Sequence, residues 1–263
     1  MRLACLTSVF GVDPLEVAAA KIAEAGYRYV ELASVHCDYN TLTNALIDNV
    51  VHEISHAGLE VVAYCPADAK ENWTRMPRVF EVAARLGASC VVAECANLSK
   101  ARELEPLCQK FLIDLAIKNR WPHPFGRPSD FAGLADGIKP CIGAGLDTGW
   151  LAVGGQDPAE LFHVAGDRIK VVHLKDVAAE GEYRTVDIGV GVAPLESFMA
   201  LLVAQGFKGP LTVARDPGKL ITLEIGVFGD ATYDVRHEAV ADDEVIRSLQ
   251  RARSWAISHG AIE

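Results

Sequence analysis

The sequence contains no long apolar run and no secretion signal. No uninterrupted apolar segment approaches the ~18 residues that a membrane-spanning helix needs. The opening stretch MRLACLTSVF lacks the charged segment, the full apolar segment and the cleavage site that together mark a signal peptide. We therefore expect a protein without a membrane partner.

Cysteine pairs and basic clusters are missing as well. The chain has seven cysteines, an odd number, with no Cys-x-x-Cys pair, and most stand in apolar, strand-like runs. This pattern is typical of reduced, buried thiols and predicts a cytoplasmic location. The 35 acidic residues outnumber 25 scattered basic ones, which gives a net charge of −10. Such a surface repels a phosphate backbone, so we expect no nucleic-acid partner.

The apolar residues, half of the chain, stand in short runs that alternate with amphipathic stretches. Each run is apolar on both faces, as expected when helices cover one side of a strand and a barrel core covers the other. The runs lie at 2–9, 27–33, 59–65, 89–95, 111–118, 141–147, 169–175 and 210–214. Eight strands alternating with helices predict one α/β domain over residues 1–263, a (β/α)8 or TIM barrel. A doubly wound open sheet is the alternative, but the even spacing of eight repeats favours closure.

Two segments interrupt this regularity. Proline and glycine are dense around residues 118–130, which predicts a long loop after the fifth strand. Residues 216–240 alternate apolar and polar side chains around a glycine, which predicts an added hairpin after the eighth strand. Because both segments follow strands, both belong at the C-terminal mouth of the barrel, where enzymes of this architecture keep their chemistry.

The segment HEISH, residues 52–56, matches the zinc-protease pattern His-Glu-x-x-His. At about 100° per residue, its two histidines lie opposite the apolar stripe of Ile47, Val50 and Ile54, and so face solvent. The segment also ends the second helix, which places it at the bottom of the barrel. We predict a solvated helix face here and no zinc site.

Polar groups gather where the predicted strands end, at the mouth. They are Glu31, Tyr64, Glu94, Lys118, Asn119, Asp147, His173, Lys175, Asp176 and Arg215. One such group alone is often structural, whereas convergence of many ionisable groups on one rim is typical of an active site. On the loops, Trp150 and Arg184 could contact a sugar ring or a phosphate, and the amides of residues 189–191 could bind an anion.

Five segments carry a resemblance to a known family. They are AARLGASCVV (83–92), GLDTGW (145–150), DRIKVVHLKD (167–176), residues 187–213 and RSLQRARSWA (247–256). In this order, and over nearly the whole chain, they resemble the sugar phosphate isomerase/epimerase family of xylose isomerase-like TIM barrels. The resemblance implies Mn²⁺ or Mg²⁺ held by a Glu, an Asp, a His and a second Glu. It also implies that the two glutamates move protons between adjacent carbons of a sugar.

The corresponding positions match this family only in part. Asp147 and His173 stand where its Asp and His ligands are expected. The family's Glu-Asn-His, however, reads Lys118-Asn119-Arg120, and Trp150 replaces a histidine that often follows the Asp. Ala214 stands in place of the second glutamate.

These departures argue against a metal cofactor. Asp147 and His173 alone cannot supply the near-octahedral, oxygen-rich shell of Mn²⁺ or Mg²⁺. An ammonium group at Lys118 would lie near the cation and repel it. We therefore expect Lys118, paired with Asp147, to stand in for the metal. If a metal were retained, its ligands would be Asp147, His173 and, were the eighth strand 220–226 instead, Glu224.

The simplest remaining chemistry is proton abstraction beside a carbonyl of a sugar or sugar-derived substrate. The catalytic candidates are Lys118, Glu94, His173 and Asp147. Lys118, with Arg215, could steady the enolate or form a Schiff base, and Glu94 or His173 could be the base. The predicted substrate contacts are Glu31, Tyr64, Asn119, Trp150, Lys175, Arg184 and Arg215. Isomerisation, epimerisation and elimination all pass through such an enolate, so each remains open.

A non-catalytic subunit is the main alternative. Loss of both glutamates is what a sugar-binding or assembly subunit derived from this family would show. Metal-dependent endonucleases share the fold, but their clusters of His and Glu ligands are absent from this sequence. Barrels of this group often pair, so a homodimer is one of the oligomeric states that the sequence leaves open.

Overall fold

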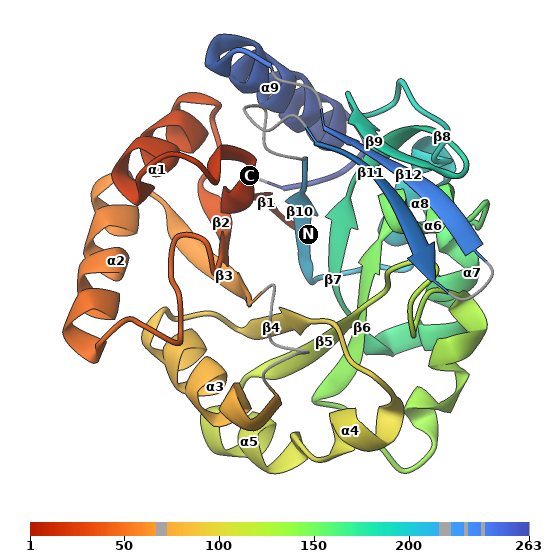
Figure 1. Ribbon diagram of the computed structural model, residues 1–263, viewed down its shortest axis with the longest axis horizontal. Coiled ribbons are helices and arrows are strands. Elements are labelled where there is room, and N and C mark those ends of the chain that lie inside the picture. Colours follow the sequence, from red (N-terminus) through yellow and green to blue (C-terminus); the bar gives the residue numbers. More distant parts are fainter. Residues whose placement is uncertain (67–72, 216–221, 229–230, 238–239, 263) are drawn as a thin grey trace.

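The computed structural model describes residues 1–66, 73–215, 222–228, 231–237 and 240–262, and its centre is a closed barrel of eight parallel strands (Figure 1). Around the barrel the strand order is β1-β10-β7-β6-β5-β4-β3-β2. The strands are β1 (Arg2–Leu6), β2 (Tyr29–Ala33), β3 (Glu60–Cys65), β4 (Cys90–Ala93), β5 (Asp114–Lys118), β6 (Ile142–Asp147), β7 (Ile169–Leu174) and β10 (Pro210–Val213). All eight predicted strands are present, so the predicted (β/α)8 barrel is confirmed.

Helices surround the barrel (Figure 1), and their apolar side chains pack against it. They are α1 (Leu15–Glu24), α2 (Asn44–His56), α3 (Met76–Arg85), α4 (Leu98–Arg102), α5 (Glu105–Phe111), α6 (Thr148–Val153), α7 (Pro158–Ala165), α8 (Leu195–Ala204) and α9 (Asp242–Ser258). Short 3-10 segments lie at Thr7–Phe10, Trp73–Arg75, Pro128–Ala135 and Gly166–Arg168. Fully buried Ile22, Ile47, Phe80 and Phe198 show the apolar layer between helices and strands that closes such a fold.

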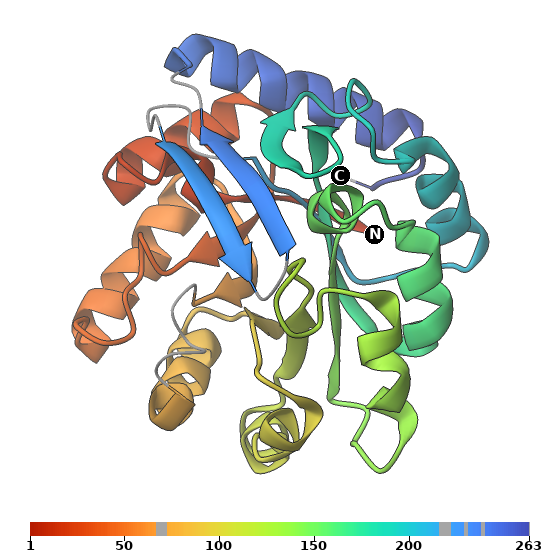
Figure 2. The ribbon, with the colours of Figure 1, turned by 45° about the vertical axis from the view of Figure 1, so that its right-hand side comes forward.

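A second sheet lies at the C-terminal end of the barrel (Figure 2). It contains β8 (Asp176–Ala179), β9 (Glu182–Val186), β11 (Thr222–Phe228) and β12 (Ala231–His237), in the order β11-β12-β9-β8. The antiparallel pair β11–β12 confirms the hairpin predicted in 216–240. The β8–β9 hairpin was not predicted, and β12 pairs with it through β9.

The eighth barrel strand is β10, which lies between β1 and β7. Ala214 therefore follows the last barrel strand, as the first of the two assignments proposed. Glu224 lies in β11, which belongs to the second sheet and not to the barrel. The alternative in which residues 220–226 close the barrel is wrong, and the Glu224 side chain lies outside the described residues.

Two further expectations can be checked on the surface and in the core. His52 and His56 are exposed on α2 while Ile54 beside them is buried, so the HEISH segment is a solvated helix face, as predicted. All seven cysteines are free thiols, five of them buried. Within the part of the chain that the structure describes, no helix combines the length and the apolar character needed to cross a bilayer.

Gly143 in β6 provides a test of the barrel register. A Cβ at this position would lie 1.9 Å from the backbone oxygen of Arg168, which no side-chain rotation can relieve. We expect Gly143→Ala to lower the free energy of unfolding by about 3 kcal/mol, measured by urea denaturation. The control is Gly145→Ala, where the added Cβ would meet its nearest atoms at 3.3 Å, and the loss should be clearly smaller. Equal stability of the two variants would contradict the register.

Candidate active site

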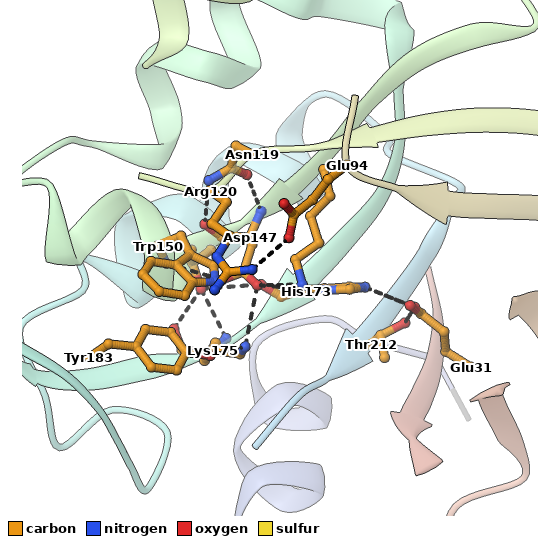
Figure 3. A network of polar contacts seen from close by, with 12 residues as sticks. Glu31, Glu94, Asn119, Arg120, Asp147, Trp150, His173, Lys175, Tyr183 and Thr212 are labelled. Carbon is orange, nitrogen blue, oxygen red and sulfur yellow. Dashed lines mark hydrogen bonds and ion pairs between the residues drawn. The ribbon is translucent and has the colours of Figure 1, made fainter. Parts of the chain in front are cut away.

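Asp147 is the centre of a polar network at the mouth end of β6 (Figure 3). Its side chain has no exposed surface. The Oδ1 atom accepts a hydrogen bond of 3.1 Å from the Trp150 amide and so caps α6. The buried Asn119 side chain accepts from the Asp147 amide at 2.6 Å and donates to its carbonyl at 3.1 Å. The carboxylate is therefore fixed in position by its own helix and by the neighbouring strand.

The other carboxylate oxygen, Oδ2, faces three nitrogen atoms of basic side chains. Lys175 Nζ lies at 3.4 Å, His173 Nδ1 at 3.6 Å and Lys118 Nζ at 3.8 Å. Burial raises the pKa of Asp147, but Lys175, His173 and Lys118 lower it more, so the pKa lies well below its ordinary value of 3.8. Asp147 is therefore ionised at neutral pH, and the predicted ion pair with Lys118 is present.

His173 lies between two buried carboxylates. Its Nε2 is 2.8 Å and 2.9 Å from the two oxygens of Glu31, and Thr212 donates to Glu31 at 2.9 Å. Burial lowers the pKa of His173, but Glu31 and Asp147 raise it by more than burial lowers it, so the pKa lies above its ordinary value of 6.5. For the acid Glu31 burial acts in the other direction and raises the pKa, yet His173 and Thr212 bring it below its ordinary value. The row Glu31–His173–Asp147 thus crosses the barrel from β2 through β7 to β6 as an ionised group.

Lys175 is held beside Asp147 by hydrogen bonds to its backbone and its ammonium group. Its amide donates to Thr148 Oγ1 at 2.9 Å, and the same hydroxyl donates to the Lys175 carbonyl at 2.6 Å. The Lys175 ammonium donates to the hydroxyl of Tyr183 on β9. Only 6% of the lysine side chain is exposed, so this cation is part of the permanent interior of the barrel.

An aromatic stack connects this lysine to Arg120. The rings of Trp150 and Tyr183 are stacked with their centroids 3.9 Å apart, and the Arg120 guanidinium lies 5.1 Å from the Trp150 centroid. Arg120 also donates to Glu94 at 2.9 Å, as Figure 3 shows. Trp150 is 4% exposed, so its rings serve as support for Arg120 in this arrangement.

Three charged side chains lie closer to solvent than the rest of the network. Exposure reaches 17% for Lys118, 16% for Glu94 and 33% for Arg120. A ligand entering from the mouth meets these three groups first. Arg120 was not among the predicted site residues, although its place two residues after Lys118 at the end of β5 was a usable signal.

Other predicted site residues lie outside this network. Tyr64 is buried and donates to the Cys37 carbonyl at 2.7 Å. Arg184 pairs with Glu182 on β9 at 2.9 Å. Arg215 pairs with Asp187 and contacts Ser248 of α9. Contacts between these three residues and a substrate stay predictions.

The predicted anion site at residues 189–191 is wrong, because the amides of Gly189 and Gly191 already donate to a carboxylate of the protein itself. Gly189 and Gly191 donate to Asp176 Oδ2 at 3.0 Å and 2.9 Å, and Ala193 donates to Oδ1 at 3.1 Å. Asp176 is buried, so its carboxylate already occupies the concavity that these amides form. Asp176, the first residue of β8, is therefore a structural residue that holds the loop after β9.

The residues around Asp147 do not fit a divalent metal ion. The Oδ2 atom that would be a ligand has two ammonium groups within 4 Å, and both nitrogens of His173 face carboxylates. At the other two metal-ligand positions of the family that the sequence resembles, this chain has Lys118 and Ala214. Among the described residues, no group of three or more His, Cys, Asp and Glu side chains is arranged to hold a metal.

Comparison with known proteins establishes the family. The model of the xylose isomerase-like TIM barrel family matches residues 19–229 of the 263, and the chain belongs to this family. A search of proteins with curated functions gave no match.

Solved structures share the fold over the full chain. D-psicose 3-epimerase with D-tagatose from Clostridium cellulolyticum H10 is 11% identical with a TM-score of 0.75, and 100% of each chain is covered. The IOLI protein with a bound zinc atom is 15% identical with a TM-score of 0.73, and 98% of each chain is covered. A probable 3-DHS dehydratase from Bacillus anthracis is 11% identical with a TM-score of 0.68, covering 95% of this chain and 98% of the other. At such identities the likeness shows the fold alone.

The charge state of His173 predicts a pH dependence of stability. Because folding raises the pKa of His173, the imidazolium contributes to the free energy of unfolding. This contribution is fully present below pH 6.5 and is lost as pH rises through the pKa of His173 in the folded protein. Each unit of the shift corresponds to about 1.4 kcal/mol. In urea unfolding, the free energy of unfolding of the wild type should therefore decline between pH 6 and 9, and that of His173→Gln should not.

The control for this experiment is His52→Gln, because His52 is exposed on α2. This variant should keep the wild-type decline. A wild-type profile no steeper than that of His173→Gln would show that His173 is not held as an imidazolium.

Proposed function

We propose that the chain is an enzyme of the isomerase/epimerase type that moves a proton beside a carbonyl of a sugar or sugar-derived substrate, without a divalent metal. The observation that carries the proposal is the position of two ammonium groups, Lys175 and Lys118, at 3.4 Å and 3.8 Å from the buried Asp147 carboxylate. They supply fixed positive charge beside the residue that corresponds to a metal ligand in the family.

Lys118 is the group suited to the carbonyl oxygen. Its side chain is less buried than that of Lys175, and it is reached from the mouth. When a proton leaves the carbon beside a carbonyl, negative charge develops on the oxygen, and a fixed cation there lowers the barrier. Lys175 and His173, which are almost fully buried, keep Asp147 compensated while Lys118 contacts the substrate.

Glu94 is the group suited to be the base. It follows β4 directly, one residue beyond the Ala93–Ile117 pair of the β4–β5 ladder, which places it beside Lys118. His173 is a poor base because it is buried, and because both ring nitrogens already face carboxylates. We therefore assign proton abstraction to Glu94 and a positioning role to His173.

The same enolate leads to several products. Return of the proton to the neighbouring carbon, with transfer of the hydroxyl proton between the two adjacent oxygens, gives isomerisation. Return to the other face of the same carbon gives epimerisation, and loss of a β-hydroxyl as water gives dehydration. The epimerase and dehydratase among the similar structures support this range of reactions. A sugar-binding subunit without turnover is the second candidate, favoured by Lys118 and Ala214 at two positions of the family's metal ligands.

Replacement of Lys118 tests its role. We expect Lys118→Met to lower kcat/KM at least about 100-fold, the loss typical when a group that stabilises an oxyanion is removed. Lys118→Arg should retain more activity, since the positive charge stays. The assay is turnover in a screen of keto- and aldo-sugars, with circular dichroism to verify folding.

The matched control is Lys170→Met. Lys170 has 16% side-chain exposure and an ion pair of 2.8 Å with Asp114, near the start of β7 and far from the mouth. Its activity should equal that of the wild type. Unchanged turnover in Lys118→Met would remove Lys118 from the mechanism, and ligand binding without turnover in the wild type would favour the subunit.

Metal removal tests the other half of the proposal. Because fixed cations occupy the surroundings of Asp147, we expect turnover to be unchanged after dialysis against EDTA and after addition of Mn²⁺ or Mg²⁺. Elemental analysis of the purified protein should find no stoichiometric divalent ion. Activity that is lost with EDTA and restored by Mn²⁺ would contradict a metal-independent reaction.

A further inference from the structure

The buried part of the network is electrically balanced. Its carboxylates are Glu31 and Asp147, and its cations are Lys175 and the His173 imidazolium, all nearly or fully buried. Each acid has a cation at contact or near-contact distance. Among the described residues this layer therefore needs no further counter-charge.

Among the network residues described above, those that face the mouth have surplus positive charge. Arg120 and Glu94 form one ion pair at 2.9 Å, which leaves Lys118. Its nearest acidic atom is Asp147 Oδ2 at 3.8 Å, which is too far for a hydrogen bond. Within the described part of the chain, no acceptor lies within hydrogen-bond distance of the Lys118 ammonium, although the protein as a whole has a net charge of −10.

Proton transfer does not use up this surplus. When Glu94 takes a proton from the substrate, its own negative charge disappears and one negative charge appears on the substrate oxygen. The sum of charges in the pocket is the same before and after. The surplus charge of the resting site thus remains for a group that is negative from the start.

We infer that the substrate carries a permanent anionic group, a carboxylate or a phosphate, which Arg120 binds together with Lys118, the same ammonium group that contacts the carbonyl oxygen. The two residues are two positions apart at the end of β5, where the Asn119 amide still continues the ladder to Gly145, so their side chains lie on the same side. Glu94 and the Trp150 ring hold the guanidinium in place, and a planar guanidinium matches the geometry of both anions.

Binding measurements test this inference without a need for turnover. Calorimetric titrations would compare D-glucitol with D-gluconate and D-fructose with D-fructose 6-phosphate, each pair differing in the anionic group. We expect at least one anion to bind about ten- to hundredfold more tightly than its neutral partner. This preference should shrink as ionic strength rises. Binding of gluconate alone, of the phosphate alone or of both would each support the inference and identify the anion.

Variants locate the binding site. Lys118→Met and Arg120→Gln should each remove most of the preference, and Arg120→Lys should retain part of it because the charge stays. Lys170→Met and Arg85→Gln are the controls; Arg85 pairs with Asp48 at 3.0 Å at the C-terminal end of α3, away from the mouth, and both should behave as wild type. Circular dichroism of each variant verifies folding.

The inference would be overturned if neither anion bound at millimolar concentration, if neutral and anionic partners bound equally, or if both mouth variants kept the preference. It rests on the proposed proton transfer, but the two fail separately. Turnover of a neutral sugar without anion preference would overturn the inference and leave the proposed function in place. Anion binding that depends on Lys118 and Arg120, without turnover of any sugar, would do the reverse.

Discussion

The ionised carboxylate of Asp147 determines the organisation of the whole mouth. A carboxylate with no exposed surface is strongly unfavourable unless opposite charges lie beside it. Here one of its oxygens is shared by Lys175, His173 and Lys118 at 3.4–3.8 Å, and the other caps α6. With Asn119 on its backbone, this one residue joins β5, β6, β7 and α6. Its counter-charges are side chains of the protein itself, which cannot exchange with solvent as a bound ion can.

This arrangement separates a rigid layer from a working layer. Below, Glu31, His173 and Lys175 are buried, charged and paired, which fixes the electrostatic field of the barrel centre. Above, Lys118 and Glu94 reach the mouth on neighbouring strands. Since the lower layer does not have to rearrange during a reaction, its charges act as preorganised dipoles and ions. The stack of Trp150 on Tyr183 supports the mouth in the same way and extends this rigidity to β9.

The barrel could be predicted from the sequence because its signals are local. Each of the eight strands is a short run that is apolar on both faces, and its length and the amphipathic stretches that flank it identify it as a buried strand. The β8–β9 hairpin escaped because residues 182–186 form a short, mostly polar strand, and β12, the second partner of this strand, is distant in the sequence. The choice between β10 and residues 220–226 likewise depended on which segment pairs with β1.

The site could be predicted only as a set of strand ends. The ion pair of Lys118 with Asp147 followed from the changed motif at β5, and the structure contains it. That Glu31 reaches His173 could not be read, because the contact spans the barrel between β2 and β7 and depends on its diameter. Asp176 stood in the same list of strand ends, yet it binds the amides of the loop after β9, and only the loop conformation shows this.

The most direct test of the fixed-cation account is a crystal structure of the protein grown with Mn²⁺, with diffraction data collected to record anomalous scattering. The account predicts electron density for the Lys118 and Lys175 ammonium groups beside Asp147 and no anomalous peak among them. An ordered Mn²⁺ bound directly to Asp147 and His173, with the lysines displaced, would contradict it.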